Sequence, residues 1–465
     1  MKTSSSLKNK RMIMFWAKMF IVILQTAMYG WLWYHHYKDM MPVEYWRRGN
    51  WVIIGLYGLF IIVFSRAFGA LKVGYLKTWD IMYSQFLTIF CVNAVTYLQL
   101  SLINGDWKFP KNSGPIFALA GLDLVVVLIW ALFMRFIYAF MYPPHEMLLI
   151  YGDISPDTII KKIESRKDKY HVKDKIALSE GMDKIYSEIL KYNAILIGDI
   201  SVGDRNLLIK YCFEQNIRCY GIPKITDIMI RHSESIDLFD SPLLLFRNNG
   251  LTYRQLFVKR IMDIGISLAG IILASPIMLL IAIFVKAYDG GPIFYRQKRQ
   301  TKDGREFEIL KFRSMITDSE RNGARLAKEH DNRITPVGRV IRRLHFDELP
   351  QLFNILKGDM AFVGPRPERK EITEEYSREI PEFPYRLKVK AGLTGYAQVY
   401  GQYNTLPYDK LKLDLTYITN YSLWLDIKLI ILTVRILFQK EKTEGVDDTQ
   451  TTALKKQERE KVWFL

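Results

Sequence analysis

The chain has 465 residues, of which 49% are hydrophobic and 24% charged, and it carries a formal net charge of +17. This composition excludes both a disordered chain and one buried in a membrane throughout, and the length allows several domains. A basic chain can bind nucleic acid, an anionic bilayer or phosphorylated substrates; long apolar runs favour the last two, so we expect no nucleic-acid partner. The three cysteines, Cys91, Cys212 and Cys219, have neither metal-ligand spacing nor the even number of a disulfide framework.

Four apolar runs follow a basic tail at residues 1–12, which we place in the cytoplasm. The runs lie near 13–34, 51–68, 81–103 and 116–138, and each approaches the roughly 20 residues needed to cross the hydrocarbon. We therefore predict four transmembrane helices within residues 13–142. An even number of crossings puts both ends in the cytoplasm, although the loop charges agree only weakly. We find no ionisable constellation that would mark a transport path, and we interpret the helices as an anchor and the scaffold of a homodimer.

Strand and helix patterns alternate after Pro143 and Pro144, which predicts an α/β module at residues 143–248. Short strands are expected at 147–152, 193–198 and 218–222, with helical stretches around 159–163 and 207–215. This alternation is typical of a doubly wound, Rossmann-like sheet. The first strand ends in Gly152-Asp153-Ile154-Ser155 instead of the glycine-rich turn that binds a pyrophosphate. A scaffold or regulatory role is therefore the default expectation, with nucleotide binding as the alternative.

Residues 249–288 decide the membrane topology. Lys259 and Arg260 lead into an apolar run that is long enough for a fifth crossing but is broken by Ser275 and Pro276. Proline removes a helical hydrogen bond and bends the helix, and the serine hydroxyl can satisfy a freed backbone group. We therefore predict a re-entrant helix that returns to the face it entered. Lys259 and Arg260 would then lie at headgroup level facing anionic lipid, or they are ordinary snorkelling cations.

Two adjacent carboxylates, Asp347 and Glu348, stand out in the mixed α/β region at residues 289–440, where a hairpin of strands near 291–297 and 307–312 is also expected. Carboxylates beside cations stay ionised, so either can attack an electrophile or hold a divalent metal. Cations spaced around them suit a substrate with several phosphate charges; the candidates are Lys311, Arg313, Arg333 and Arg366. The simpler interpretation is that Asp347 caps a following helix, and we expect it to do so in either case.

Five ordered segments in this region resemble the bacterial sugar transferases, monotopic phosphoglycosyl transferases that load a phosphosugar onto polyprenyl phosphate. The similar segments are Lys259-Arg260-Ile261-Met262-Asp263, Lys311-Phe312-Arg313-Ser314-Met315, Asp347-Glu348-Leu349-Pro350-Gln351, Val363-Gly364-Pro365-Arg366-Pro367 and Gly392-Leu393-Thr394-Gly395-Tyr396-Ala397-Gln398. The four preceding apolar runs and the α/β module are similar to those of the long-form members. Ala391 and Thr301 depart from the family pattern, which puts local loop shape in doubt rather than chemistry.

The resemblance implies a two-step reaction at the cytoplasmic face of the bacterial inner membrane. Asp347 would attack the β-phosphorus of a UDP-sugar, UMP would leave, and polyprenyl (undecaprenyl) phosphate would take the hexose-1-phosphate from the aspartyl intermediate. It also implies Mg²⁺ on Glu348, and substrate contacts from Gln351, Lys259 and Arg260 besides the four cations named above. Such a step would begin exopolysaccharide, capsule or O-antigen synthesis.

Two other functions stay open from the sequence. An inverting membrane glycosyltransferase would move the sugar without its phosphate and release UDP. A non-catalytic membrane scaffold for polysaccharide assembly would use the carboxylates only as a helix cap. The charged tail at 441–465 does not favour either of these functions. The sequence also does not identify the sugar that is transferred.

Overall fold

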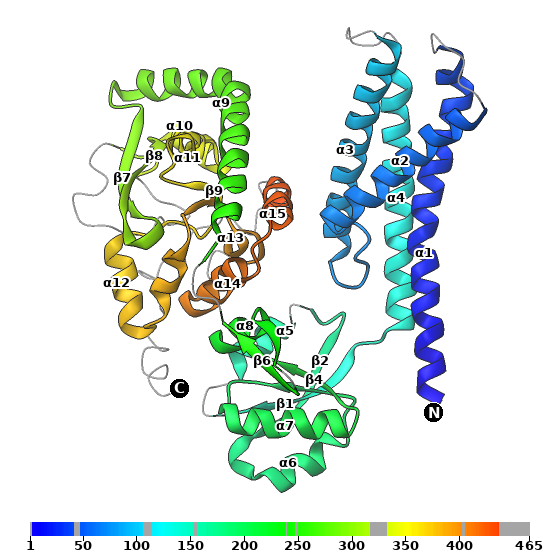
Figure 1. Cartoon of the computed structure of the whole chain (residues 1–465), viewed down its shortest axis with the longest axis vertical. Coiled ribbons are helices and arrows are strands. Elements are labelled where there is room, and N and C mark those ends of the chain that lie inside the picture. The colour runs from blue at the N-terminus through cyan, green and yellow to red at the C-terminus, as the bar shows by residue number, and fades with distance from the viewer. Residues whose placement is uncertain are drawn as a thin grey trace. The chain divides into compact units, whose positions relative to one another are not determined.

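The structure is a computed structural model, and it describes residues 2–40, 47–105, 113–152, 156–164, 166–238, 240–246, 250–316, 333–401 and 405–436. The chain forms two compact units, Met1–Gly221 and Ile222–Leu465 (Figure 1). The predicted tail at 441–465 lies outside the described residues.

Four long helices open the first unit: α1 (Lys2–Leu32), α2 (Arg47–Phe68), α3 (Thr78–Asn104) and α4 (Gly114–Met141), with the short turns η1 (Trp33–Tyr37) and η2 (Lys38–Met40) extending α1. Consecutive helices pack against each other and α1 also contacts α4, so the four close into a bundle (Figure 1). Each matches a predicted apolar run and is long and apolar enough to cross a membrane. The basic segment at 1–12 is part of α1 from Lys2 onward.

The interior of this bundle is more polar than the sequence patterns indicated. Asp123 of α4 is fully buried, and the Tyr57 hydroxyl of α2 donates to its Oδ2 at 3.3 Å. Helix α3 buries Ser84, Thr88 and Asn93, whereas its phenylalanines are exposed. Ionisable groups inside membrane helices face the bundle interior because lipid cannot solvate them. Asp123 is a buried ionisable group that the sequence analysis did not single out, and its one hydrogen-bond partner among the described residues is a tyrosine hydroxyl.

A parallel four-stranded sheet completes the first unit. Its strands, β1 (His145–Tyr151), β2 (Tyr170–Ala177), β3 (Ala194–Ile197) and β4 (Arg218–Gly221), lie in the order β2-β1-β3-β4. Apolar side chains of α6 (Met182–Ile189) and α7 (Val202–Glu214) cover one face, and those of α5 (Asp157–Glu164) cover the other; η3 (Leu178–Glu180) precedes α6. The three predicted strands are present with helices on both faces. The edge strand β2 and helix α6 were not predicted.

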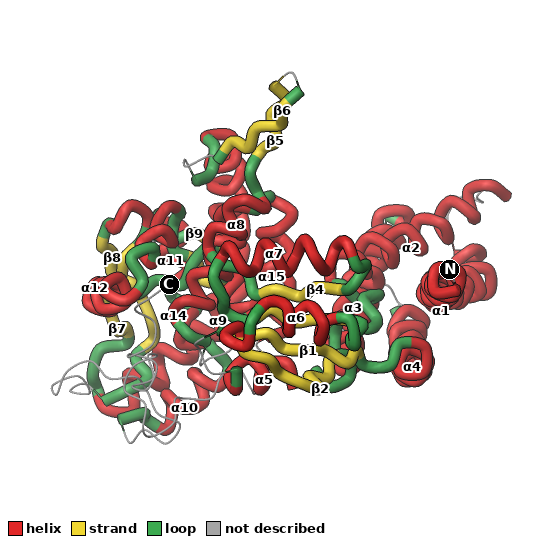
Figure 2. The backbone as a smooth tube through the Cα atoms, turned by 90° about the horizontal axis from the view of Figure 1, so that it is seen from below, coloured by secondary structure: helices red, strands yellow, loops and turns green. Residues whose placement is uncertain are grey.

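The second unit begins with α8 (Ile225–Arg231) and a hairpin of β5 (Glu234–Leu238) and β6 (Ser241–Leu245). The sequence patterns place this stretch in the α/β module, but Ile225 and Ile228 of α8 pack into the core of the second unit. Figure 2 shows the hairpin extending away from α8.

Helix α9 (Tyr253–Asp289) is the fifth helix in the described chain that is long and apolar enough to cross a membrane. It contains Pro276, and the Ser275 hydroxyl donates to the Ile272 carbonyl oxygen at 2.8 Å. Figure 1 shows α9 bent into two limbs. We attribute the bend to Pro276, because proline lacks the N–H that would continue the helical hydrogen bonds and its ring clashes with the preceding turn.

The remaining elements of the second unit follow α9 in the chain. They are β7 (Phe294–Gln300), η4 (Lys302–Gly304), β8 (Glu306–Phe312), α10 (Pro336–Arg343), η5 (Phe346–Glu348), α11 (Gln351–Lys357), β9 (Ala361–Val363), α12 (Lys370–Glu379), η6 (Phe383–Lys388), β10 (Gly392–Thr394), α13 (Tyr396–Tyr400), α14 (Pro407–Thr419) and α15 (Leu423–Ile436). Strands β7 and β8 pair antiparallel, which confirms the predicted hairpin. Met278 and Ile281 of α9 pack with Phe312 of β8 and Ile341 of α10, so the second limb of α9 supports the strand and helix beside the carboxylates.

Strands β9 and β10 form a short parallel pair that carries the Gly-Pro-Arg-Pro loop. A Cβ added to Gly364 would lie 2.3 Å from the Lys390 carbonyl oxygen, so this position admits only glycine. The Gly364 amide donates to Thr394 at 2.8 Å, and the Gly392 amide donates to Pro365 at 2.9 Å. The start of the loop is therefore fixed against β10.

Candidate active site

Asp347 and Glu348 lie in a tight turn between two helices. Helix α10 begins at a capping side chain, Thr335, and ends beside Leu344. His345 follows with φ of 54°, a left-handed conformation that non-glycine residues seldom adopt. The chain then makes the 3-10 turn η5, which contains both carboxylates, before α11 starts. Strand β8 packs against this turn, so the carboxylates come close to the end of the hairpin.

Asp347 does not cap α11, which corrects the expectation from the sequence. The N-cap position of α11 belongs to Pro350, and no side chain caps the helix there. Asp347 lies one turn earlier, and its carboxylate makes no hydrogen bond or ion pair with any residue that the structure describes. Its oxygens are thus available to a substrate.

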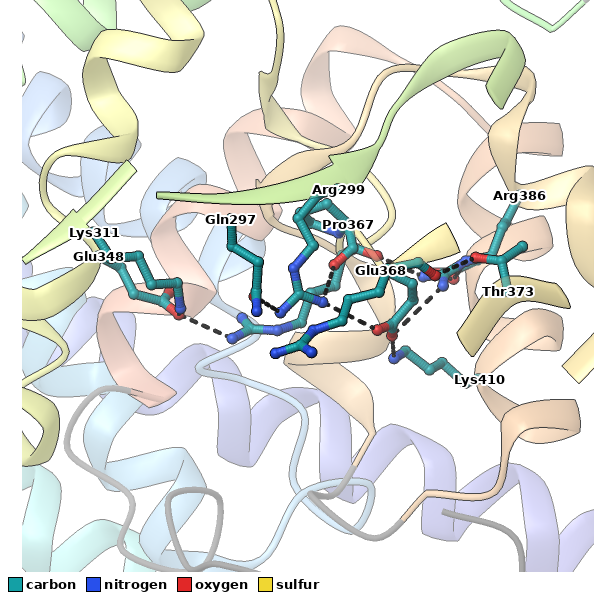
Figure 3. Close-up of polar contacts among 12 residues, drawn as sticks. Gln297, Arg299, Lys311, Glu348, Pro367, Glu368, Thr373, Arg386 and Lys410 are labelled. Carbon is teal, nitrogen blue, oxygen red and sulfur yellow. Dashed lines mark hydrogen bonds and ion pairs between the residues drawn. The ribbon is translucent and has the colours of Figure 1, made fainter. Parts of the chain in front are cut away.

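Glu348, in contrast, is held by two cations from distant parts of the chain. Lys311 Nζ at the end of β8 donates to Glu348 Oε1 at 2.9 Å, and Arg366 Nη2 from the loop after β9 donates to the same oxygen at 2.9 Å (Figure 3). The second oxygen, Oε2, has no such partner within the described part of the chain. The Glu348 side chain is only 15% exposed, so these charges interact with little screening by water.

The two neighbouring carboxylates differ in acidity. Burial alone would raise the pKa of Glu348, but Arg366 and Lys311 outweigh it and hold that pKa well below its usual range. Burial raises the pKa of Asp347, and the charge of Glu348 raises it further, while Lys311 and Arg342 oppose the shift. Adjacent cations thus lower the pKa of Glu348, whereas for Asp347 they only oppose the effect of burial.

A second carboxylate, Glu368, lies just beyond the loop and was not predicted. Its Oε1 forms an ion pair with Lys410 Nζ and lies 3.7 Å from Arg386 Nη1, while its Oε2 lies 3.7 Å from Arg299 Nη1 (Figure 3). Burial would raise the pKa of Glu368, but Lys410 and Arg386 outweigh it and lower the pKa to about 2. The only signal in the sequence was a glutamate directly after the Gly-Pro-Arg-Pro segment, because its partners lie 18 to 69 positions away.

One predicted phosphate ligand, Arg313, has another carboxylate partner, and for Arg333 the structure gives a backbone contact. Arg313 is buried and pairs with Asp289 at the end of α9, where Nη1 donates to Oδ2 at 2.7 Å. The Arg333 carbonyl oxygen accepts from the Ile316 amide at 3.0 Å, which places this residue beside the segment that follows β8. Gln351 is buried at the first position of α11. The structure thus brings Lys311 and Arg366 to the carboxylates and gives Arg313 a structural partner.

Lys259 and Arg260 do not extend towards lipid. Lys259 is buried, and its Nζ donates to Asp426 Oδ2 at 2.6 Å. Arg260 donates from Nη1 and Nη2 to the carbonyl oxygens of Ile355 and Leu356, at 2.6 and 2.7 Å. These are the orphan carbonyls at the end of α11, which cations commonly satisfy. The two residues therefore join α9 to α15 and α11 within the second unit, and neither the headgroup nor the snorkelling interpretation describes them.

The residues present fit a magnesium ion. No group of three or more potential metal ligands occurs among the described residues, so a site built from protein alone is not formed there. Magnesium, however, prefers one or two carboxylates together with water and substrate phosphates. Glu348 Oε2 and the Asp347 carboxylate offer such oxygens without a competing partner in the described chain.

The fold and this site define a membrane-associated protein with a carboxylate–cation centre suited to phosphorylated substrates. The pattern that describes the "Bacterial sugar transferase" family matches residues 254–440. The chain is 32% identical over 426 residues to a UDP-N-acetylgalactosamine-undecaprenyl-phosphate N-acetylgalactosaminephosphotransferase of Aeromonas hydrophila. The aligned stretch covers 90% of this chain and 92% of that protein. The chain belongs to the bacterial sugar transferase family.

Two further relatives match about half of their own length or less. A UDP-glucose:undecaprenyl-phosphate glucose-1-phosphate transferase of Xanthomonas campestris pv. campestris is 38% identical over 228 residues, 47% of each chain. A protein of the same description from Klebsiella pneumoniae is 42% identical over 204 residues, 43% of this chain and 42% of that one.

Proposed function

We propose that this protein transfers a sugar-1-phosphate from a UDP-sugar to undecaprenyl phosphate and releases UMP. The observation that carries the proposal is the Asp347 carboxylate, which has no partner among the described residues. It lies next to Glu348, and Lys311 and Arg366 hold Glu348 in place. The names of the relatives supply the substrate class, because each describes a phosphosugar transferase acting on undecaprenyl phosphate.

The reaction proceeds in two displacements at one phosphorus atom. An oxygen of Asp347 forms a bond to the β-phosphorus of the UDP-sugar, the diphosphate P–O bond breaks, and UMP leaves with its electron pair. An oxygen of undecaprenyl phosphate then attacks the same phosphorus, and the bond to Asp347 breaks. The product is undecaprenyl-diphosphosugar, and the carboxylate is regenerated.

The protein's own groups position and neutralise charge in both steps. Arg366 and Lys311 donate to Glu348 Oε1, and from this position they can also contact the phosphate oxygens that carry charge in the transition state. Arg366 suits this task, because its planar guanidinium can bind two oxygens at once. Glu348 would hold Mg²⁺, which when bound neutralises charge on the diphosphate. Asp347 must be ionised to attack. Lys311 and Arg342 favour the ionised state against the effect of burial, and a bound dication would favour it further.

The membrane arrangement belongs to the same proposal. The four-helix bundle anchors the chain in the bacterial inner membrane, α9 enters one leaflet and returns at its bend, and the site faces the cytoplasm. Single cysteines at Tyr253 and Asp303, in a chain whose native cysteines are replaced, test this topology with a membrane-impermeant maleimide. Both positions are largely exposed. They should label from the same side of the membrane; labelling from opposite sides would show that α9 crosses it.

The nucleotide product decides the reaction. Purified full-length protein is incubated with undecaprenyl phosphate, Mg²⁺ and a panel of UDP-glucose, UDP-galactose and UDP-N-acetylgalactosamine. Release of UMP with one donor supports the proposal. Release of UDP would establish an inverting glycosyltransferase, and no release with any donor would favour a scaffold. Donor labelled in its β-phosphate should leave label on Asp347 when undecaprenyl phosphate is withheld.

A proposed homodimer is tested separately. The mass of the detergent-solubilised chain, measured by light scattering with the detergent subtracted, should equal two copies, and a mass of one copy would reject it.

A further inference from the structure

The loop that carries Arg366 is held at three successive carbonyl oxygens, although it has no regular secondary structure. The Arg366 carbonyl accepts from Arg386 Nη2 at 2.9 Å, and the Pro367 carbonyl accepts from Arg299 Nη1 at 3.4 Å. The Glu368 carbonyl accepts from the Gln300 amide at 2.9 Å. Figure 3 shows Arg299, Pro367, Glu368 and Arg386 grouped together beside Lys410. Beyond its start, the loop is therefore held by one side chain from η6 and by one side chain and one backbone amide from β7.

Arg386 is the most deeply buried of these donors. Its side chain is 2% exposed, Nε donates to Asp414 Oδ2 at 2.9 Å, and the guanidinium lies 5.0 Å from the Phe383 ring centre. Asp414 is equally buried, at 1%. A buried ion pair is weak support for stability, since apolar residues of similar volume often replace such a pair without loss. An apolar side chain could not, however, donate to the Arg366 carbonyl.

That bond acts on the residue whose side chain reaches Glu348. The Arg366 side chain is 45% exposed, so packing alone does not fix its conformation. A fixed backbone and a fixed partner for the guanidinium are both needed to hold it in one position. Its guanidinium is bound to Glu348 at one end, and its own carbonyl oxygen is bound to Arg386 at the other. A shift of about 1 Å in a positioning element can lower a rate about 10²-fold.

We propose that Arg386 is a positioning residue: anchored on Asp414, it fixes the Arg366 backbone so that the Arg366 guanidinium stays on Glu348 and the phosphate site. The inference rests on the proposed function. Arg386 contacts none of the reacting groups and acts only through Arg366. Removing Arg386 should therefore matter only while Arg366 is present.

A double-mutant cycle on the full-length protein tests this dependence. Arg386→Lys keeps the positive charge opposite Asp414 and Glu368, but an ammonium group lacks the planar fork that spans Asp414 and the Arg366 carbonyl together. We expect Arg386→Lys to lower kcat/KM for UMP release by about 10- to 100-fold, and Arg366→Ala to lower it by about 10²- to 10³-fold. Adding Arg386→Lys to Arg366→Ala should change kcat/KM less than about twofold, because residues that act as a unit are not additive.

Arg305→Lys is the matched control. Arg305 pairs with Asp359 at 3.0 Å within the same unit and forms no hydrogen bond or ion pair with the loop in the described part of the chain, so kcat/KM should stay at the wild-type value. Asp414→Asn is a second variant, which weakens the anchor of Arg386 and leaves Arg386 in place. It should lower kcat/KM in the wild-type background and leave it unchanged in Arg366→Ala, even if Arg386→Lys fails to fold.

The outcomes separate this inference from the function on which it rests. UMP release by the wild type decides the function, and the comparison between the two backgrounds decides the role of Arg386. If UMP is released but Arg386→Lys and Asp414→Asn lower kcat/KM by the same factor with and without Arg366, Arg386 does not act through Arg366. If the wild type releases no UMP, both proposals fail.

Discussion

Glu348 and Glu368 are two largely buried glutamates, 20 positions apart, that both pair with basic side chains but differ in the ligands they can still bind. Lys410, Arg386 and Arg299 surround Glu368, and both of its oxygens have a cationic neighbour. Glu348 receives Lys311 and Arg366 on one oxygen only, and its neighbour Asp347 has no partner in the described chain. We call the Glu368 cluster closed, because both carboxylate oxygens have a cationic neighbour. We call the Glu348 cluster, which includes Asp347, open, because some of its carboxylate oxygens have no partner in the described chain.

This difference separates a structural ion network from a site that can take a substrate. A carboxylate with all its acceptor positions filled fixes the groups around it and gains little from a further ligand. A carboxylate pair with oxygens left over can bind a metal or attack phosphorus. The Arg366 loop connects the two clusters, so the closed cluster supports the open one.

Asp347→Asn tests the open cluster most directly. The amide has nearly the same shape but is not a nucleophile, so UMP release should fall by more than about 10³-fold. Label from a β-phosphate-labelled donor should no longer remain on the protein. Thermal stability should stay within about 2 °C of the wild type, because Asp347 has no described partner to lose.

Asp303→Asn is the control for that variant. Asp303 is 78% exposed in the β7–β8 turn, with φ of 57°, which asparagine also adopts readily. Its UMP release should equal that of the wild type. Near-normal turnover by Asp347→Asn would assign the nucleophile to another group.

Glu348→Gln should have a somewhat smaller effect, because it removes the charge that Lys311 and Arg366 contact but leaves the nucleophile. We expect kcat to fall by about 10²- to 10³-fold. If Glu348 holds the metal, the Mg²⁺ concentration for half-maximal rate should rise in the variant, and excess Mg²⁺ should restore part of the rate. An unchanged Mg²⁺ dependence would remove Glu348 from the metal site.

The sequence predicted much of this arrangement where the signal is local. The four apolar helices and the β7–β8 hairpin follow from runs of apolar residues and from alternation across a turn. Strand β2 was missed because it lies at the sheet edge, and most of its side chains are at least partly exposed. A strand with little burial has no need of the apolar residues that reveal it.

The site was harder to predict, because its partners are joined by tertiary contacts. The ordered motifs predicted that Lys311, Glu348 and Arg366 act together, but they did not indicate which oxygen each cation binds. The capping role of Asp347 failed because the turn η5 precedes α11 and Pro350 takes the N-cap position. Arg386 and Asp414 form a pair 28 positions apart that no local pattern marks.

One local signal could have corrected the interpretation of Lys259. Lys259, Asp263 and Ser267 recur at intervals of four and therefore share one face of α9. All three are buried, with Lys259 paired to Asp426 and the Asp263 carboxylate accepting from the Phe362 amide at 2.9 Å. A polar stripe at helical spacing in an apolar helix indicates a face turned towards protein rather than lipid.

A substitution in the closed cluster should lower the stability of the protein. Glu368→Gln leaves Lys410 and Arg299 without a counter-charge and removes one of the two carboxylates beside Arg386, which keeps Asp414. Breaking a buried pair in this way costs about 3 kcal/mol. The melting temperature of the second unit should fall by several degrees. Glu308→Gln is the control. Glu308 Oε2 lies 3.5 Å from Arg296 Nη1, and the two side chains are 56% and 66% exposed, so this pair contributes little to stability. Equal stability of the two variants would show that the Glu368 cluster is not structural.

The pH dependence of that loss gives the smallest and most specific test. The pKa of Glu368 is lowered to about 2 in the folded chain, against about 4.3 when unfolded. A lowered pKa means that the stabilisation is present above pH 4.3 and is lost as the pH falls towards 2. The difference in melting temperature between wild type and Glu368→Gln should therefore be constant from pH 7 to about 5, and shrink as the pH falls below about 4. A difference that persists undiminished at pH 2.5 would mean that the loss of stability comes from packing and not from the charge of Glu368.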